Sequence, residues 1–373
     1  MTDPRSASPN PGAAATGAQV AARRPLFQRA PGLLRWESLL LVILALLAIE
    51  GARLSKFFLT GPNFANLVSA EMEVAIVALP MTLIIITGEI DLSVESMIGL
   101  SGAILGWLWA AGVPIEVGIP IVLVVGALGG LLNGLLVARV GLPSLVVTLG
   151  TLALFRGLAN VVLGPTAVSN FPAGFTAFGF GNIPGTPVPW TLIVFAVLGV
   201  VFYLVAHRTW IGRQVFAVGK NKDAARYSGV RVGTLKAALF VLSGVIAALA
   251  GVILAARFSS ARADNGTGLT LVVVTIVLLG GVDINGGKGT ITGVILAVFT
   301  LSVLQNALRL AGVSSEYQAV AVGLLLIGSV TAPYLARQTR SYSDRARRGR
   351  HPPAGSMVPG EVVGRRLEEE NIS

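Results

Sequence analysis

Long blocks of apolar residues, separated by short polar stretches, run along most of the chain. A soluble domain would show its apolar residues at helical or strand spacing, so continuous blocks are typical of segments that lie in lipid. Because about 20 residues at a rise of 1.5 Å cross the roughly 30 Å of bilayer hydrocarbon, the blocks predict about ten membrane-spanning helices. The expected fold is therefore an all-α polytopic membrane protein. Its spans are expected near 36–53, 64–87, 93–111, 115–138, 143–163, 188–206, 234–256, 269–281, 290–309 and 316–335, the eighth of them short.

Composition agrees with a membrane location and adds an orientation. Only 12% of the residues are charged and the mean hydropathy is +0.77, while the formal net charge is +10. Lys and Arg crowd the N-terminal segment, the stretch 207–236 and the tail after Arg337. Since cytoplasmic segments of membrane proteins carry an excess of Lys and Arg, we expect both termini and this stretch in the cytoplasm, with an even number of spans. No nucleic-acid partner is needed to explain the basic excess.

The two ends of the chain differ from its middle. Residues 1–32 are rich in Pro, Ala, Gly and Ser and are expected to form a disordered cytoplasmic arm. No small-residue cleavage site follows the first apolar run, so we interpret it as a retained span. The transmembrane domain is expected over 33–336, with a cytoplasmic loop at 207–236. Residues 337–373 are expected to be a disordered cytoplasmic tail, whose Arg-rich stretch is a positive-inside anchor or contacts anionic lipid.

Three carboxylates interrupt the apolar pattern between the second and third spans. Glu89, Asp91 and Glu95 lie between two apolar runs, although a charged carboxylate at membrane depth costs on the order of 2 to 3 kcal/mol. Gly88 can end the first helix, and Asp91 or Ser93 can cap the next. Two interpretations stay open. The stretch is a tight turn with acidic caps at the membrane surface, or Glu89, Asp91, Ser93 and Glu95 lie beside a transport pathway.

Other polar residues fall inside predicted spans. Arg156 lies in the fifth span, and Glu71 and Glu73 lie near the start of the second, so a buried pair between Arg156 and a carboxylate is a hypothesis. Asn133 and Asn306 are expected to form hydrogen bonds between helices. A short internal repeat also exists, because the sequence 280–285 parallels 88–93 and each follows an apolar run.

Several kinds of chemistry are not expected. The chain has no cysteine, and no grouping of His, Asp and Glu has metal-ligand spacing, so neither a thiolate site nor a metal is predicted. The segment Gly286–Thr290 is not a P-loop, because Val282 stands where the first Gly is required. Catalytic machinery is likewise lacking. We therefore expect no cofactor, no enzymatic activity, and an energy source in another subunit or in an ion gradient.

The basic stretch 207–236 contains a predicted short helix. Asn221 is a suitable N-cap, Asp223 lies in the first turn, Ala224 and Ala225 favour helix, and Gly229 is a typical stop. A short cytoplasmic helix suits a rigid connection to another protein. The alternative is an ordinary helix at the membrane interface.

Four motifs, in order along the chain, resemble one family. They are Gly-x-Ile-Asp-Leu-Ser-Val at 88–94, Gly-Leu-Pro-Ser-Leu-Val-Val-Thr-Leu-Gly-Thr at 141–151, Ala-Val-Gly-Lys-Asn at 217–221 and Leu-Leu-Gly-Gly-Val at 278–282. Together they are similar to the permease subunits of bacterial ABC sugar importers of the ribose, rhamnose and autoinducer-2 type. Glu89 and Glu95 stand where that family mostly has Gly, so the chain carries extra acid at this point.

The resemblance implies a function and a set of partners. A permease of this family has the ABC importer permease fold, lies in the bacterial inner membrane, and moves a small sugar into the cytoplasm. It works with a second permease, identical or related, with ATPase subunits, and with an extracytoplasmic sugar-binding protein. Asp223-Ala-Ala-x-x-x-Gly229 is similar to the Glu-Ala-Ala-x-x-x-Gly loop that fits a cleft on the ATPase. The resemblance therefore assigns Asn221, Asp223, Ala224, Ala225 and Gly229 to coupling.

Two other functions stay open. An ion-coupled secondary transporter would use Glu89, Asp91 and Glu95 as a proton relay, and a branched-chain amino acid permease would share the architecture. A further open point is the aromatic-rich segment 164–189, with Phe171, Phe175, Phe178 and Phe180. Its aromatic rings either rest at the membrane interface or form a docking surface for the binding protein.

Overall fold

The computed structural model describes residues 36–329 and 331 of the chain. The predicted arm 1–32 and the predicted tail 337–373 lie outside the described residues. Within the described range the regular elements are helices, apart from two isolated β-bridges. They are α1 (Trp36–Leu54), α2 (Gly61–Ile86), α3 (Val94–Ala110), α4 (Ile115–Leu135), the π-helical turn η3 (Leu136–Val140), α5 (Ser144–Leu163), α6 (Ala173–Phe180), α7 (Trp190–Arg208), α8 (Trp210–Lys220), α9 (Lys222–Tyr227), α10 (Val232–Phe258), α11 (Leu269–Leu279) and α12 (Ile291–Leu310), followed by a helix over 315–329.

Each of the ten predicted spans coincides with a helix. Among the described residues, α2, α4 with η3, α5, α7, α10 and α12 are long and apolar enough to cross a membrane, while α3 and α11 are shorter apolar helices. The prediction of an all-α polytopic membrane protein is confirmed. The eighth span is short as expected, because α11 has 11 residues.

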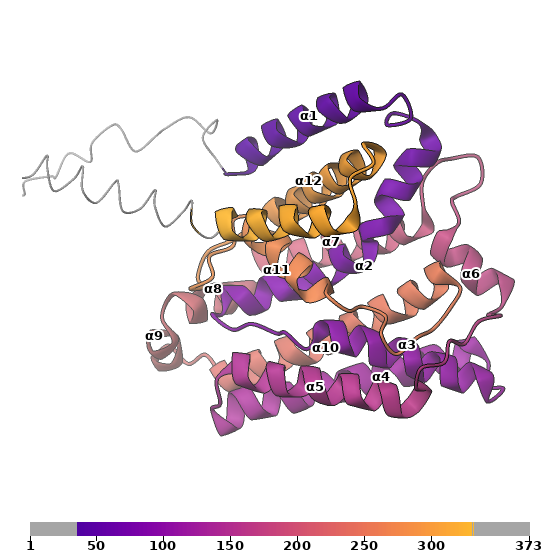
Figure 1. Ribbon diagram of the computed structural model, residues 1–373. Helices are drawn as coiled ribbons and strands as arrows, with labels where there is room; N and C mark the ends of the chain where they lie inside the picture. The colour runs from indigo at the N-terminus through magenta and orange to yellow at the C-terminus, as the bar shows by residue number, and fades with distance from the viewer. Residues whose placement is uncertain (1–35, 330, 332–373) are drawn as a thin grey trace, which may run out of the picture.

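The helices pack side by side, with α6 at one end of the bundle and α8 and α9 at the opposite end (Figure 1). Helix α2 forms the centre, since its residues 71–86 are all buried. Helix α10 packs against α2, α3, α4 and α6. These contacts bring the residues on either side of the acidic stretch 87–93 together with α10.

Glycines allow α4 and α10 to approach closely. A Cβ on Gly130 would lie 2.8 Å from Val241 Cα, and one on Gly244 would lie 2.9 Å from the Gly130 nitrogen. The atoms on both sides of this contact belong to the backbone, so the movement of a side chain could not make room for a larger residue. In lipid, packing of this kind holds helices together, because lipid chains are as apolar as the side chains they replace.

Two interruptions in the helices position the polar residues described below. The first is the non-helical stretch 87–93 between α2 and α3, where Gly88 has φ +80°. The second is the loop 259–268, which joins α10 to the short helix α11. Both expose backbone N–H and C=O groups inside the bundle, and such groups need partners there.

The stretch 207–236 is more regular than the predicted loop with one short helix. It consists of the end of α7, all of α8 and α9, and the start of α10. Thr209 caps α8 by accepting a hydrogen bond from the Gly212 N–H at 3.4 Å. Helix α8 was not predicted from the sequence because its residues fall in a basic stretch, although their apolar and polar positions alternate at helical spacing.

Candidate functional site

Asp91 lies at the centre of a buried hydrogen-bond network. Its side chain accepts the Ser93 N–H at 3.0 Å and the Ser93 hydroxyl at 2.6 Å on Oδ1, and the Ser243 hydroxyl at 2.8 Å on Oδ2. Asn133 Nδ2 in turn donates to Ser93 Oγ at 2.9 Å. Since Ser243 belongs to α10 and Asn133 to α4, Asp91 links the stretch 87–93 to α10 directly and to α4 through Ser93. The expectation that Asn133 forms an interhelical hydrogen bond is thus met.

The helix cap predicted for this stretch has a different form. Ser93 occupies the N-cap position of α3 but makes no side-chain cap hydrogen bond, because its hydroxyl donates to Asp91 instead. Asp91 forms a turn of its own by accepting the backbone N–H two residues later. The capping prediction was therefore wrong for Ser93, whose side chain points into the packed bundle.

Glu89 forms an ion pair with Lys236 near the start of α10. Only 7% of the Lys236 side chain and 17% of the Glu89 side chain are exposed. A buried ammonium without a counter-charge would be strongly unfavourable, so Glu89 is the group that permits Lys236 at this position. The pair lies at the end of the bundle where α8 and α9 are found.

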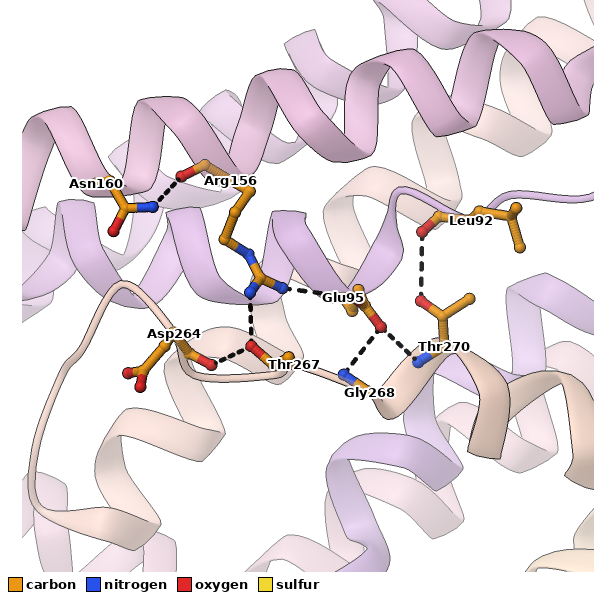
Figure 2. Close-up of polar contacts among 8 residues, drawn as sticks. All are labelled: Leu92, Glu95, Arg156, Asn160, Asp264, Thr267, Gly268 and Thr270. Carbon is orange, nitrogen blue, oxygen red and sulfur yellow. Dashed lines mark hydrogen bonds and ion pairs between the residues drawn. The ribbon is translucent and has the colours of Figure 1, made fainter. Parts of the chain in front are cut away.

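Glu95 links the two shorter apolar helices, α3 and α11. Its Oε2 accepts the backbone N–H groups of Gly268 at 3.1 Å and Thr270 at 3.2 Å, at the N-terminus of α11 (Figure 2). Its Oε1 lies 3.4 Å from Arg156 Nη2 of α5. The first N–H groups of a helix have no partner within the helix and carry partial positive charge, so a carboxylate is a suitable partner.

Arg156 extends this cluster toward the loop before α11. Its Nη1 donates to the Thr267 hydroxyl at 2.6 Å, and that hydroxyl donates to the Asp264 carbonyl oxygen at 2.6 Å (Figure 2). The Thr270 hydroxyl donates to the Leu92 carbonyl at 3.3 Å, which closes the link between the two helix interruptions. The hypothesis of a pair between Arg156 and a carboxylate is confirmed by the Glu95 contact.

A third ion pair lies nearer the α6 end of the bundle. Arg257 Nε donates to Glu73 Oε1 at 2.7 Å, and the Glu73 side chain is 1% exposed. The pair lies beside a cavity of about 280 Å³. Its lining consists of Ala70, Glu73, Val74, Leu254, Arg257, Phe258, Arg262, Asp264, Asn265, Gly266, Thr267 and Leu269.

This cavity was not predicted from the sequence. Glu73 was identified as an intramembrane charge, but its partner was not. The pair is separated by 184 positions in the chain, so no spacing rule connects its members. The sequence offers only a weak indication of this pair. An intramembrane Glu requires a partner, and few cations lie toward the α6 end of the bundle.

The predicted coupling residues lie together on α9 and the turn after it. Asn221 Oδ1 accepts the Ala224 N–H at 2.9 Å, which confirms the predicted N-cap, and Gly229 has φ +85°. Ala224 is exposed, whereas Ala225 is buried against the rest of the chain. The outer face of this helix is therefore formed by Ala224 with its neighbours, and the two alanines do not share one open face.

Helix α9 follows a point of close contact with the end of α2, where the non-helical stretch 87–93 begins. A Cβ on Gly219, at the end of α8, would overlap the Ile86 carbonyl oxygen and the Gly287 nitrogen. Gly287 also donates its N–H to the Ile86 carbonyl at 2.8 Å. The end of α2, the end of α8 and the loop between α11 and α12 thus meet at one point, directly before α9.

The internal repeat seen in the sequence has a structural counterpart. Asn285 N–H donates to Asp283 Oδ1 at 3.2 Å, as Ser93 N–H donates to Asp91. In each case an apolar helix ends next to a glycine of positive φ, and the aspartate turn follows. No group of three His, Cys, Asp or Glu side chains that could hold a metal ion is found in the described part of the chain.

A bundle of membrane-length helices with charged side chains paired at helix breaks is the architecture of a transport protein. The chain belongs to the family described as "Branched-chain amino acid transport system / permease component", whose model matches residues 63–330. The family is one of transport permeases, not of enzymes.

Several relatives are about equally similar to the chain. The Autoinducer 2 import system permease protein LsrD of Yersinia enterocolitica is 41% identical over 260 residues, which cover 68% of this chain and 78% of the relative. The proteins of the same name from Yersinia pseudotuberculosis and Yersinia pestis are 40% identical over the same shares. No solved structure matches the chain. The resemblance to importer permeases predicted from the sequence motifs is confirmed.

Proposed function

We propose that this chain is the permease subunit of an ABC importer that carries autoinducer 2, or a sugar of similar size and polarity, into the cytoplasm. The observation that carries the proposal is the 41% identity to an autoinducer 2 import permease over 68% of the chain. The chain itself is not an enzyme and has no ATP site, so its energy comes from separate ATPase subunits. An extracytoplasmic binding protein delivers the substrate, and a second permease, identical or related, completes the membrane part.

The coupling role belongs to α9 in this proposal. Asn221 caps the helix, Asp223 lies in its first turn, Ala224 and buried Ala225 keep it slim, and Gly229 ends it. Neighbouring Tyr227 is 93% exposed. A large exposed aromatic residue beside a short capped helix is suited to a protein contact, because aromatic residues are enriched at interfaces.

The charge distribution supports a cytoplasmic location for the α8 and α9 end. Basic residues gather there, namely Arg139, Arg208, Arg213, Lys220, Lys222, Arg226, Arg231, Lys236 and Lys288. Fewer lie toward the α6 end, namely Arg53, Lys56, Arg257, Arg262 and Arg309. By the positive-inside rule the first end is cytoplasmic, and the connection from α7 to α10 faces the ATPase. The same rule places both termini in the cytoplasm.

Movement of α9 would be transmitted to the helix breaks by contacts already described. Gly219 and Gly287 pack against the Ile86 carbonyl, so a tilt of α8 and α9 displaces the end of α2. The stretch with Glu89, Asp91, Ser93 and Glu95 follows directly. These four residues are candidates for the pathway, in the sense that their network is rearranged when access changes from outside to inside.

The ion-coupled alternative has less support from this geometry. Glu89 is paired with Lys236, and Glu95 accepts two backbone N–H groups and contacts Arg156. A proton relay needs carboxylates that exchange protons with one another, whereas each of these is engaged by a separate donor.

Reconstitution tests the proposal. The chain with its ATPase, its second permease and its binding protein is placed in liposomes, and uptake of radiolabelled autoinducer 2 is measured with ribose, rhamnose and leucine as competitors. We expect uptake that requires ATP, persists with a proton ionophore present, and is not reduced by leucine. Uptake driven by a proton gradient without ATP, or competition by leucine alone, would contradict the proposal.

A further inference from the structure

The cavity beside the Glu73–Arg257 pair has the chemistry of a ligand site. It is formed by α2, the end of α10 and the loop 259–268, at the end of the bundle opposite α9. Its volume of about 280 Å³ is just below the range of about 300 to 1,000 Å³ usual for small-molecule sites. The space therefore suits a molecule smaller than a typical drug.

Arg257 is held in place yet retains free donors. Among residues 36–329, its guanidinium donates one hydrogen bond, from Nε to Glu73, and its centre lies 4.5 Å from the Phe258 ring centroid. A guanidinium has five N–H donors, so the two Nη groups remain for a ligand.

The facing wall supplies acceptors and further donors. Arg262 and Asp264 form a two-point ion pair at 2.9 and 3.1 Å, which leaves acceptor capacity on both Asp264 oxygens. Thr267 also lines the cavity and connects it to Arg156 and Glu95 (Figure 2). The Thr267 hydroxyl therefore connects a ligand in the cavity to the hydrogen-bond network that joins α3, α5 and α11.

This wall is well supported by the fold. The loop pairs with another loop through two backbone hydrogen bonds between Val168 and Ala261, at 3.0 and 2.8 Å. Gly99 of α3 lies so close to it that a Cβ would be 2.9 Å from the Ala263 carbonyl oxygen. The backbone of this wall is thus fixed before a ligand arrives, which lowers the entropy cost of binding.

A second cavity lies next to the first. It has a volume of about 260 Å³ and shares Ala70 and Arg257 with its neighbour. Its other lining residues include Asn66, Ser69 and Asn182. Arg257 therefore stands between two polar spaces along α2.

We propose that the cavity formed by Glu73, Arg257, Arg262, Asp264 and Thr267 binds a polyhydroxylated molecule of monosaccharide size as it enters the permease. This inference rests on the proposed function and names a site for its substrate. Each hydroxyl of such a molecule both donates and accepts hydrogen bonds, which matches a wall of alternating guanidinium, carboxylate and hydroxyl groups.

Cysteine labelling in the reconstituted importer tests the site. Because the chain has no cysteine, Asn265→Cys gives one thiol at the cavity, and Leu59→Cys gives one in the exposed connection before α2. The reagent is a membrane-impermeant maleimide and the probe is autoinducer 2, without the binding protein. We expect the probe to slow labelling of Asn265→Cys at least threefold and to leave Leu59→Cys unchanged.

A kinetic measurement complements the labelling. Asp264→Asn removes one charge in an exposed loop, so it is expected to raise the KM for uptake threefold to tenfold at unchanged Vmax and abundance. Arg53→Gln, which breaks the exposed pair with Glu50, is the matched control and is expected to keep the wild-type KM. Unprotected labelling together with a wild-type KM for Asp264→Asn would overturn the site while ATP-driven uptake still supports the importer. Loss of that uptake in the wild-type protein would instead contradict the proposed function.

Discussion

Two aspartate turns, at residues 87–93 and 280–290, have the same local form and different surroundings. In each, a carboxylate accepts the N–H two residues later, after an apolar helix that ends beside a glycine. Asp91 is 2% exposed and also accepts hydroxyls from Ser93 and Ser243, whereas Asp283 is half-buried in the loop beside α8. A turn motif therefore does not define a role. The helices that pack around Asp91 convert a turn into a link between α4 and α10.

The largest expected effect is on the buried turn. Asp91→Ala removes the acceptor for two buried hydroxyls and one backbone N–H, so we expect the free energy of unfolding to fall by on the order of 4 kcal/mol. Asp283→Ala is the matched variant and is expected to cost less, because the Asn285 backbone N–H and side-chain amide that Asp283 accepts belong to an exposed residue and find a partner in water. Unfolding in detergent, followed by circular dichroism, gives both values. Equal losses would remove the distinction between the two turns.

Glu89 has no counterpart in the second turn, where Gly281 occupies the same position. Its substitution is expected to lower the free energy of unfolding somewhat less than Asp91→Ala does. Glu89→Gln leaves the buried Lys236 ammonium with a neutral acceptor, so we expect a loss of roughly 2 kcal/mol in the free energy of unfolding. The double variant Glu89→Gln/Lys236→Met removes the uncompensated charge and is expected to recover at least half of that loss. If the double variant is no more stable than Glu89→Gln, the ion pair does not explain why Glu89 is present.

A pair of glycines extends the comparison to the two ends of the bundle. Gly229 follows α9 with φ +85°, and Gly112 lies in the turn between α3 and α4 with φ +84°, and neither has a neighbour within 4 Å of an added Cβ. Valine at either position costs about 1 to 2 kcal/mol of backbone strain. We expect equal abundance of Gly229→Val and Gly112→Val, but an uptake rate and a rate of ATP hydrolysis reduced at least tenfold for Gly229→Val alone. Full activity of an abundant Gly229→Val protein would count against the coupling role of α9.

The smallest expected effect concerns the exposed carboxylate of the outer loop. The hydrogen bond from Arg262 lowers the pKa of Asp264 below its usual value of 3.8. A lowered pKa in the folded protein means that the pair stabilises the fold above the unfolded pKa and loses this contribution as the pH falls through the folded pKa. Between about pH 5 and 8 Asp264 stays ionised. Uptake rates of wild type and Asp264→Asn are therefore expected to keep a constant ratio across this range, and a ratio that changes more than twofold would contradict the assignment.

The sequence by itself determined the class of protein and most of the helices. Long apolar blocks have few alternatives to membrane-spanning helices, because backbone groups in lipid must be satisfied within the segment. Local signals were sufficient for α9, since the side chain of Asn221 caps its own helix and Gly229 ends it. The Asp91 turn was visible in the same way, as a short polar motif after an apolar run.

Only the tertiary structure decided which charges are partners. Glu89 pairs with Lys236, Glu95 contacts Arg156 and the start of α11, and Glu73 pairs with Arg257. The members of these pairs are 61 to 184 positions apart in the chain. A carboxylate inside a membrane requires a donor, but many cations satisfy that requirement equally well in the sequence. The choice among them depends on which helix faces lie side by side, and the close contacts between glycines of α4 and α10 help to set that arrangement.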